Sequence, residues 1–384
     1  RTRAPDDRRQ SSRLMSKRVS ISPRATPPWT VRVVVPTASL IAAAVLGGLV
    51  IAVAGNDAFE AYRTILDSSF NGLRPFTRTM TLATPLILTG LAAAIAFRMK
   101  VWNIGAEGQL YMGAVVASGL ALTIPPDIPK PLMIVMIILG GAAAGAVWAG
   151  LAAIPKAYFN TDEVITTLML NFVALSFMNY LIFGSTSLWK NPKSSFPQGL
   201  LIPGSATMPR ISYRLHYGIF IAVGAAVLLW WVFRRTTYGF EVRTVSDSKE
   251  ASRYAGIRVN SKLISVLTLS GALAGIAGAI EISGVVKRLD PTVLASELGY
   301  TGIVVAAVAR FNCLGVIPVA VLLAGLVVSG SSLQRLGIPP EIVFLLQGLI
   351  FLFVAAGEFF IANKVTIAST VPVQPDASGG LAHE

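Results

Sequence analysis

The chain has 384 residues, of which 54% are hydrophobic and only 13% are charged. Soluble globular proteins carry about 25% charged residues, so this composition excludes an ordinary soluble domain and indicates a membrane protein. The net charge of +13 does not indicate a nucleic-acid partner, because the Lys and Arg residues lie between apolar runs and are not gathered in one basic domain.

The N-terminal 32 residues carry nine Lys or Arg residues, and we expect residues 1–32 to form a basic, disordered cytoplasmic tail. The first apolar run follows at 33–55. A signal peptide is the competing interpretation, because Ala52-Val53-Ala54 resembles a cleavage site. The apolar part of a signal peptide is usually about 7–15 residues long, so this longer run favours a retained membrane helix.

Further apolar runs predict an all-α membrane protein, a polytopic helical bundle of about ten transmembrane helices in contact with membrane lipid. Short runs suggest broken or tilted helices, and the membrane domain is expected to cover 33–362. The expected spans are 33–55, 79–97, 109–124, 132–154, 164–184, 216–233, 263–284, 299–309, 314–332 and 341–362. Residues 363–384 are expected to form a short C-terminal cytoplasmic tail.

The distribution of basic residues predicts the orientation of the chain. Lys and Arg are enriched in the cytoplasmic loops of membrane proteins. If the N-terminus lies inside, 21 of the 32 Lys and Arg residues fall on the cytoplasmic side, which favours cytoplasmic N- and C-termini.

A short polar segment at 101–110 interrupts the apolar runs on either side of it. Polar, non-helical backbone at membrane depth is tolerated where protein or a water-filled cavity surrounds it, and such breaks point to transport sites. Its aromatic and hydrogen-bonding groups would suit a sugar or nucleoside, so we predict a substrate path here. A tight cytoplasmic loop is the alternative. The predicted path residues are Trp102, Asn103, Glu107, Gln109 and Tyr111, with Asn171 from a later span.

Two distant segments hint at an internal repeat. Residues 89–98 resemble residues 301–310, with four identities in ten positions, and both end in Arg. Repeats are frequent in transporters, where the substrate site lies at the repeat interface. The similarity therefore predicts that 299–315 forms another wall of the path.

A second polar element, the loop 234–262, is expected on the cytoplasmic side. A Ser or Asp at 246–248 can cap a short helix that ends at Tyr254 or Ala255. Gly256 can then terminate this helix in the left-handed conformation. Such a helix suits docking into the groove of a partner, and a solvated charged loop is the alternative.

Span 263–284 has small residues at helical spacing, at Gly271, Gly275 and Gly278. Small residues let membrane helices approach closely, so we expect this span to pack tightly; a gate or pore-lining helix is the alternative. Glu281 lies near the outer end of the span and is expected to face a cavity or the interface, because a carboxylate in the bilayer centre is costly.

The chain has no phosphate-binding P-loop motif, no zinc-protease motif and no nucleophile elbow, so we expect no enzyme activity. Cys313 is the only cysteine, which excludes an intrachain disulfide and a cysteine-based metal cluster. No cofactor and no metal site are predicted. The sequence is typical of a membrane transport protein and not of an enzyme.

Several segments carry a family pattern: Asn-Ile-Gly-Ala-Glu-Gly-Gln at 103–109, then 162–171, 239–256, 270–278, 302–306 and 347–350. In this order they resemble the permease subunits of ABC importers for simple sugars and nucleosides. That family includes ribose and branched-chain amino acid permeases. The similarity covers roughly residues 79–360.

The resemblance implies one transmembrane half of an importer in a bacterial inner membrane. ABC ATPase subunits would drive alternating access from inside, and a substrate-binding lipoprotein or periplasmic protein would deliver substrate outside. The form of 103–109 is typical of the larger of two unlike permeases in nucleoside systems. It implies a second permease subunit in a heterodimer, with nucleosides or simple sugars as substrates. The implied ATPase-coupling residues are Asp247, Lys249, Glu250, Arg253, Tyr254 and Gly256.

An ion-coupled secondary transporter of small polar solutes is the alternative function. It would need ionisable residues within the membrane helices. Glu107, Glu281 and Glu358 are the candidates, and each lies near an expected helix end. A membrane scaffold or channel is a further alternative.

Overall fold

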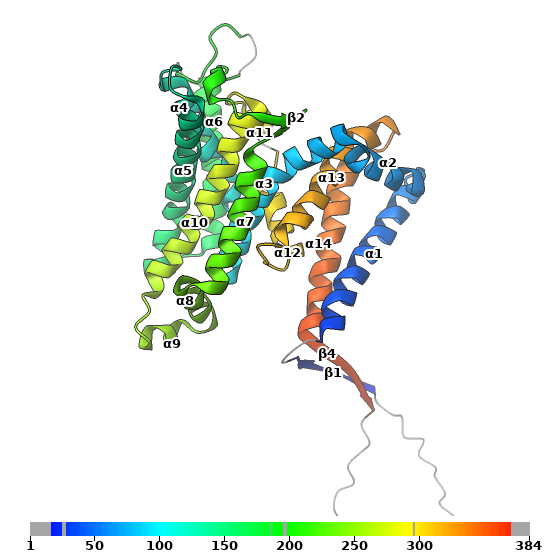
Figure 1. Ribbon diagram of the computed structural model, residues 1–384. Helices are drawn as coiled ribbons and strands as arrows, with labels where there is room; N and C mark the ends of the chain where they lie inside the picture. The colour runs from blue at the N-terminus through cyan, green and yellow to red at the C-terminus, as the bar shows by residue number, and fades with distance from the viewer. Residues whose placement is uncertain (1–16, 25–27, 185, 195–197, 295, 370–384) are drawn as a thin grey trace, which may run out of the picture. The chain divides into compact units, whose positions relative to one another are not determined.

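The computed structural model describes residues 17–24, 28–184, 186–194, 198–294 and 296–369. Most of the regular structure in these ranges is helical, as Figure 1 shows, so the predicted all-α membrane fold is confirmed. The helices are α1 (Trp29–Val53), α2 (Ala58–Phe70), α3 (Leu73–Arg98), α4 (Ala106–Thr123), α5 (Lys130–Phe159), α6 (Glu163–Asn179), α7 (Gly218–Arg235), α8 (Thr237–Asp247), α9 (Lys249–Tyr254), α10 (Val259–Ile280), α11 (Pro291–Leu294), α12 (Leu298–Val308), α13 (Val316–Arg335) and α14 (Glu341–Ala362).

Shorter elements complete the described structure. They are the π-helical turns η1 (Tyr180–Gly184) and η3 (Glu281–Val286), the 3₁₀ turn η2 (Gly204–Ala206), and the strands β1 (Lys17–Pro23), β2 (Arg210–Ser212), β3 (Leu215–His216) and β4 (Asn363–Ser369). The chain divides into two compact units, Ala43–Leu352 and the terminal stretches 1–42 with 353–384. Every candidate site residue of the sequence analysis except Glu358 lies in the larger unit.

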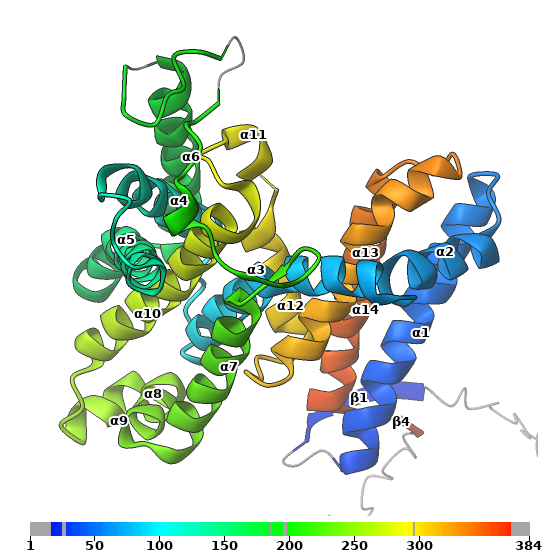
Figure 2. The ribbon, with the colours of Figure 1, turned by 45° about the horizontal axis from the view of Figure 1, so that its top comes forward.

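α3 is the central helix of the larger unit. It packs against α7, α10, α12 and α13, and Figure 2 shows it running between α10 and α13. Every residue from 83 to 97 is buried. A helix that is apolar on all sides must be surrounded by protein or lipid, and here protein surrounds it.

Glycines let three helices of the larger unit approach at backbone distance. A Cβ atom added to Gly271 or Gly275 of α10 would lie 2.3 or 2.1 Å from a carbonyl oxygen of α5. A Cβ atom added to Gly278 would lie 2.0 Å from a carbonyl oxygen of α4. No side chain larger than hydrogen fits at these distances, so the contact depends on the small-residue spacing in the sequence.

Among the described residues, nine helices are long and apolar enough to cross a membrane, against about ten expected spans. The difference is the expected span 109–124, which forms α4. Its first turn carries Glu107 and Gln109, and these polar residues lower its mean hydropathy. The expected span 299–309 is α12, which reaches spanning length only together with α11.

α2 is a helix that the apolar runs did not predict. Asp57 caps it by accepting a hydrogen bond from the backbone N–H of Phe59 at 2.8 Å. The helix is amphipathic, with Ala61 and Ile65 buried, and has 13 residues. A membrane span needs about 20 apolar residues, so a search for such runs passes over a helix of this length.

The smaller unit contains an antiparallel pair of strands, β1 and β4. We expected a disordered tail at residues 1–32 and a short cytoplasmic tail at 363–384, so this pairing differs from the expectation. Both segments alternate β-branched with polar residues, a pattern that favours strands. The expected N-terminal tail also ends early, because α1 begins at Trp29. Residues 1–16 and 370–384 of the expected tails lie outside the described residues.

His216 is a fully buried side chain at the end of the β2–β3 hairpin. Its Nδ1 accepts a hydrogen bond from the backbone N–H of Gly218 at 3.2 Å, so the neutral ring carries its proton on Nε2. The ring packs on Gly284, where an added Cβ atom would lie 2.6 Å from Cδ2. Burial, helped by the positive charge of Arg210, lowers the pKa of His216 to about 4.

This low pKa predicts a loss of stability in acid. The imidazole has a pKa near 6.5 in the unfolded chain and about 4 in the folded chain. The contribution of neutral His216 to the free energy of unfolding is therefore complete above pH ~6.5 and is lost as the pH falls towards 4. The loss should reach roughly 2–3 kcal/mol at pH 4.5. Thermal unfolding in detergent from pH 7.5 to 4.5 measures it, with His216→Phe as the control. Identical pH profiles for the two proteins would contradict the prediction.

Candidate functional site

The polar break forms a non-helical segment between α3 and α4, and Asn103 lies at its centre, fully buried. The Asn103 Nδ2 atom donates to Ser270 Oγ of α10 at 2.8 Å and to Gln109 Oε1 of α4 at 3.0 Å. Its Oδ1 atom accepts from Gln109 Nε2 and from the backbone N–H of Gly105, both at 3.0 Å. The amide is therefore saturated and ties the break to α4 and α10.

Asn171 of α6 binds the same segment from the other side. Its Oδ1 atom accepts from the backbone N–H of Gly108 at 2.8 Å. Its Nδ2 atom donates to the carbonyl oxygen of Ile104 at 2.9 Å and to the hydroxyl of Tyr300 in α12 at 3.0 Å. An added Cβ atom at Gly108 would lie 2.9 Å from Asn171 Cα, so glycine is needed for this approach of α4 to α6.

Glu107 joins α4 to the start of α12 and is 2% exposed. Its carboxylate accepts a hydrogen bond from Tyr111 Oη at 2.6 Å and another from the backbone N–H of Gly299. An unpaired buried carboxylate would be strongly destabilising, and these two donors remove much of that cost. Gly299 itself packs against the backbone of Glu107, which leaves no room for a side chain.

These bonds form one buried polar network that joins α4, α6, α10 and α12. The structure brings together five of the six predicted path residues: Asn103, Glu107, Gln109, Tyr111 and Asn171. Buried networks with every member bonded are rigid and specify one packing arrangement. In this conformation their polar atoms bind one another. Their role as contacts for substrate stays a prediction.

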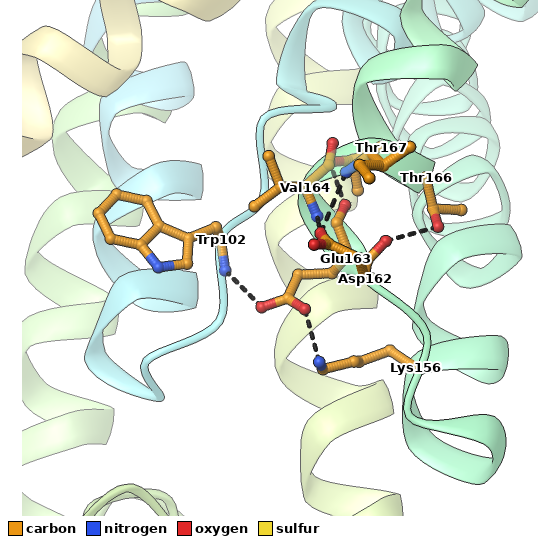
Figure 3. A network of polar contacts seen from close by, with 8 residues as sticks. Trp102, Lys156, Asp162, Glu163, Val164, Thr166 and Thr167 are labelled. Carbon is orange, nitrogen blue, oxygen red and sulfur yellow. Dashed lines mark hydrogen bonds and ion pairs between the residues drawn. The ribbon is translucent and has the colours of Figure 1, made fainter.

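Trp102 lies apart from this network and is 52% exposed. Its ring packs against Phe97 of α3, with 4.6 Å between the ring centroids. Its backbone N–H donates to Glu163 of α6 at 3.4 Å, as Figure 3 shows. The side chain is thus available to a ligand or a partner, while the backbone is anchored.

Two members of the network, Ser270 and Tyr300, were not singled out from the sequence. Each is a hydroxyl residue in an apolar helix and bonds a residue more than 100 positions away. Local spacing carries no signal for such pairs. Ser270 lies in the segment 270–278, and Tyr300 lies just before the segment 302–306. Both segments carry the family pattern, and this was the only hint in the sequence.

Figure 3 shows a second, adjoining network at the junction of α5 and α6. Lys156 Nζ lies 2.7 Å from Glu163 Oε2, and the two side chains are only 14% and 10% exposed. Asp162 caps α6 by accepting from the backbone N–H of Val164 at 2.8 Å. The ion pair therefore fixes the start of α6, from which Asn171 reaches the break.

Breaking this ion pair should be costly. Lys156→Met would leave the Glu163 carboxylate buried without its cation, and the loss of one partner of a buried pair costs about 3 kcal/mol or more. The double variant Lys156→Met/Glu163→Gln should recover most of that loss. Thermal unfolding in detergent measures both proteins. Arg63→Met is the matched control, because its pair with Asp67 is exposed and should have no measurable effect. Equal losses in the single and double variants would contradict the prediction.

The two segments of the suspected repeat lie against each other, since α3 packs on α12. Thr89 Oγ1 of α3 donates to the carbonyl oxygen of Leu298 at 3.0 Å, and Gly302 packs on Thr89. Arg98 Nε donates to the carbonyl oxygen of Phe311 at 3.0 Å. The segment 299–315 therefore adjoins the same region as the polar break.

The second polar element forms α8 and α9, at the end of the larger unit opposite β2 (Figure 1). Ser248 caps α9 by accepting from the backbone N–H of Ala251 at 3.2 Å. Gly256 adopts a φ of +78° just beyond the helix. The predicted short, capped helix is confirmed. Five of the six predicted coupling residues, Asp247, Lys249, Glu250, Arg253 and Tyr254, are exposed on or beside it, and Gly256 is exposed after it.

A family model described as "Branched-chain amino acid transport system / permease component" matches residues 76–355. This range contains the polar break, the buried network, α8 and α9. Both strands of the smaller unit, β1 and β4, lie outside the matched range.

Three known relatives are similar over most of their length. A glucose ABC transporter permease of Haloferax volcanii is 31% identical over 95% of this chain and 99% of its own. A guanosine ABC transporter permease of Bacillus subtilis is 34% identical over 84% of this chain and 92% of its own. A second guanosine permease of the same organism is 24% identical over 77% and 94%. No solved structure matches the chain.

Proposed function

We propose that this chain, which belongs to the permease-component family of branched-chain amino acid transport systems, imports nucleosides. It is a multi-pass membrane protein and a non-catalytic permease subunit of a nucleoside or sugar ABC importer. The observation that carries the choice of nucleosides is the similarity to a guanosine permease over nearly its whole length. Simple sugars are the second candidate, because a glucose permease is similar over an equally long range.

The importer would contain two unlike permeases. Systems of this type include ATPase subunits, a second permease and a binding protein. Two guanosine permeases of one organism resemble this chain to different degrees, which supports a heterodimer over a homodimer. The substrate-binding lipoprotein or periplasmic protein would deliver substrate on the side of the β2–β3 hairpin, in a bacterial inner membrane.

The helix α9 would couple the permease to the ATPase. It is short, capped and exposed, and a rigid helix of this kind can insert into a groove of a partner protein. α8 and α9 carry several basic residues, which supports a cytoplasmic position and, with it, cytoplasmic termini.

The buried network would form the fixed wall of the substrate path. Its bonds hold α12 and the break in register with α4 and α6, so displacement of one helix would move the others. We propose that Asn103, Glu107, Gln109, Tyr111 and Asn171 act on transport through this geometry, and that the exposed Trp102, outside the network, lies near the path. Because the chain is a permease subunit of an ABC importer, ATP hydrolysis by partner subunits would drive transport. Ion coupling through Glu107, Glu281 or Glu358 is therefore not part of the proposal.

Uptake by cells tests the choice of substrate. Cells lacking this chain should lose uptake of radiolabelled guanosine and regain it when the chain is restored, with glucose uptake unchanged. Loss and recovery of glucose uptake, with guanosine uptake unaffected, would contradict the nucleoside assignment and favour sugars.

A further inference from the structure

A cavity of about 410 Å³ lies in the larger unit, beside the β2–β3 hairpin and away from the polar break. Thr81 of α3, Glu281 of η3 and Val328 of α13, all buried, line its inner part. Arg78 of α3 and Arg210 of the hairpin lie at its exposed rim. Three membrane helices and the hairpin therefore line a chamber with both polar and apolar walls, which the network does not occupy.

Among the described residues that line this chamber, Glu281 is the one acidic side chain. It is 7% exposed and lines the cavity, yet within the described part of the chain it forms no hydrogen bond or ion pair. A buried carboxylate without partners is destabilising, and well-packed apolar residues would serve the fold better. Its position at the first residue of a π-helical turn is a second sign of a functional site, because such turns concentrate there.

The surroundings of Glu281 restrict what can bind it. Arg78, Arg210 and Arg214 line the same cavity, and their positive charges disfavour a cationic ligand at its mouth. Val285 and Val327 offer apolar walls. A carboxylate only accepts hydrogen bonds, and its two oxygens can accept from two neighbouring hydroxyls at once. A neutral ligand with two adjacent hydroxyls and an apolar face fits this combination.

We propose that this cavity binds the vicinal diol of the transported solute, with Glu281 accepting hydrogen bonds from both hydroxyls. The inference rests on the proposed function, because it places the transported solute in the cavity. The ribose of a nucleoside and the ring of a hexose both present such a diol. The guanidinium groups at the rim can stack on a planar nucleobase, a further contact that a hexose lacks.

The test compares each substrate with an analogue that keeps no two adjacent ring hydroxyls. The complete importer, with its binding protein, is reconstituted in vesicles and supplied with ATP. The substrate pairs are guanosine with 2′-deoxyguanosine, and glucose with 2,3-dideoxyglucose. Glu281→Gln is compared with the unmodified chain, and Glu60→Gln, the same change on the exposed side of α2, is the matched control.

Glu281→Gln should lower kcat/KM for the diol substrate by about tenfold or more, because hydrogen bonds to charged groups are strong. For the deoxy analogue the loss should be under about threefold, because the bond is already missing. The binding protein discriminates equally in both chains, so its effect cancels in this comparison. The variant should also unfold at a higher temperature, since it removes an unpaired buried charge. Whichever pair responds identifies the ribose or the hexose as the source of the diol.

Equal losses for the substrate and its analogue, or no loss for either, would overturn the inference while leaving the proposed function intact. An unmodified importer that moves neither guanosine nor glucose would overturn both. If Glu281→Gln does not assemble, Val327→Trp provides the second test, because it fills the cavity from α13. Diol uptake that is unchanged in an assembled Val327→Trp importer would also overturn the inference.

Discussion

Gly275→Val should abolish accumulation of the folded permease. A Cβ atom at this position would lie 2.1 Å from the carbonyl oxygen of Gly141 in α5, far inside van der Waals contact. From the other side, an added Cβ atom on Gly113 of α4 would lie 2.3 Å from the carbonyl oxygen of Gly275. The obstacles are backbone atoms, so no change of rotamer can relieve them. Three helices would have to separate.

The expected cost is large because whole helices, and not only side chains, must move. Overpacking a well-packed core costs about 1–3 kcal/mol when side chains can adjust, and more when backbones must shift. Folded proteins are stable by only about 5–15 kcal/mol, and destabilisation of this size reduces cellular abundance severalfold. We expect less than about a tenth of the normal amount of protein in the membrane, measured by immunoblot and by size-exclusion profile in detergent.

Gly224→Val is the matched control. Gly224 lies in α7, a membrane-spanning helix of the same unit, and an added Cβ atom there would meet nothing within 4 Å. This variant introduces the same side chain into the same kind of helix and should accumulate normally. Similar losses in both variants would mean that valine itself, and not the α10–α5 contact, is responsible.

Tyr254→Ala should weaken the contact between the permease and its ATPase while the permease assembles normally. Tyr254 is 94% exposed at the end of α9, an unusual position for a large aromatic residue unless a partner covers it. The helix beneath it is capped by Ser248. Ser252 is fully buried, and its Oγ atom donates to the carbonyl oxygen of Ser248 at 2.7 Å. A fixed, exposed tyrosine is the typical centre of a protein interface.

Truncating such a residue costs about 2 kcal/mol or more, which corresponds to a roughly 30-fold weaker contact with the ATPase. Stimulation of the ATPase by the permease and substrate uptake should both fall by a similar factor. Tyr180→Ala, which truncates an exposed tyrosine in η1, is the control and should leave both unchanged. Full coupling in Tyr254→Ala would contradict the assignment of α9. Loss of the folded permease would instead indicate a structural role.

Local patterns predicted most of the fold. Apolar runs located the spanning helices, small residues at helical spacing located the α10 contact, and Ser248 with Gly256 bounded α9. Each of these signals lies within one element. α2 escaped because it is too short and too polar for an apolar run, and the pairing of β1 with β4 joins segments at the two ends of the chain.

The candidate site depended on contacts that a sequence does not display. The break at 101–110 was visible, but its partners Ser270 and Tyr300 were not, because hydrogen bonds between distant helices leave no periodic trace. The cavity could not be predicted from the sequence either. The carboxylate of Glu281 was expected to face a cavity or an interface, and only the folded chain places arginines around that cavity.

The most direct test of the account is uptake by the purified importer in sealed vesicles, with ATP supplied only to the cytoplasmic side of the permease. The account predicts that guanosine accumulates only when this chain, its second permease, the ATPase and the binding protein are all present. Accumulation should stop when the ATPase is inactivated and should not respond to an imposed proton or sodium gradient. Uptake that persists without ATP hydrolysis and follows an ion gradient would contradict it.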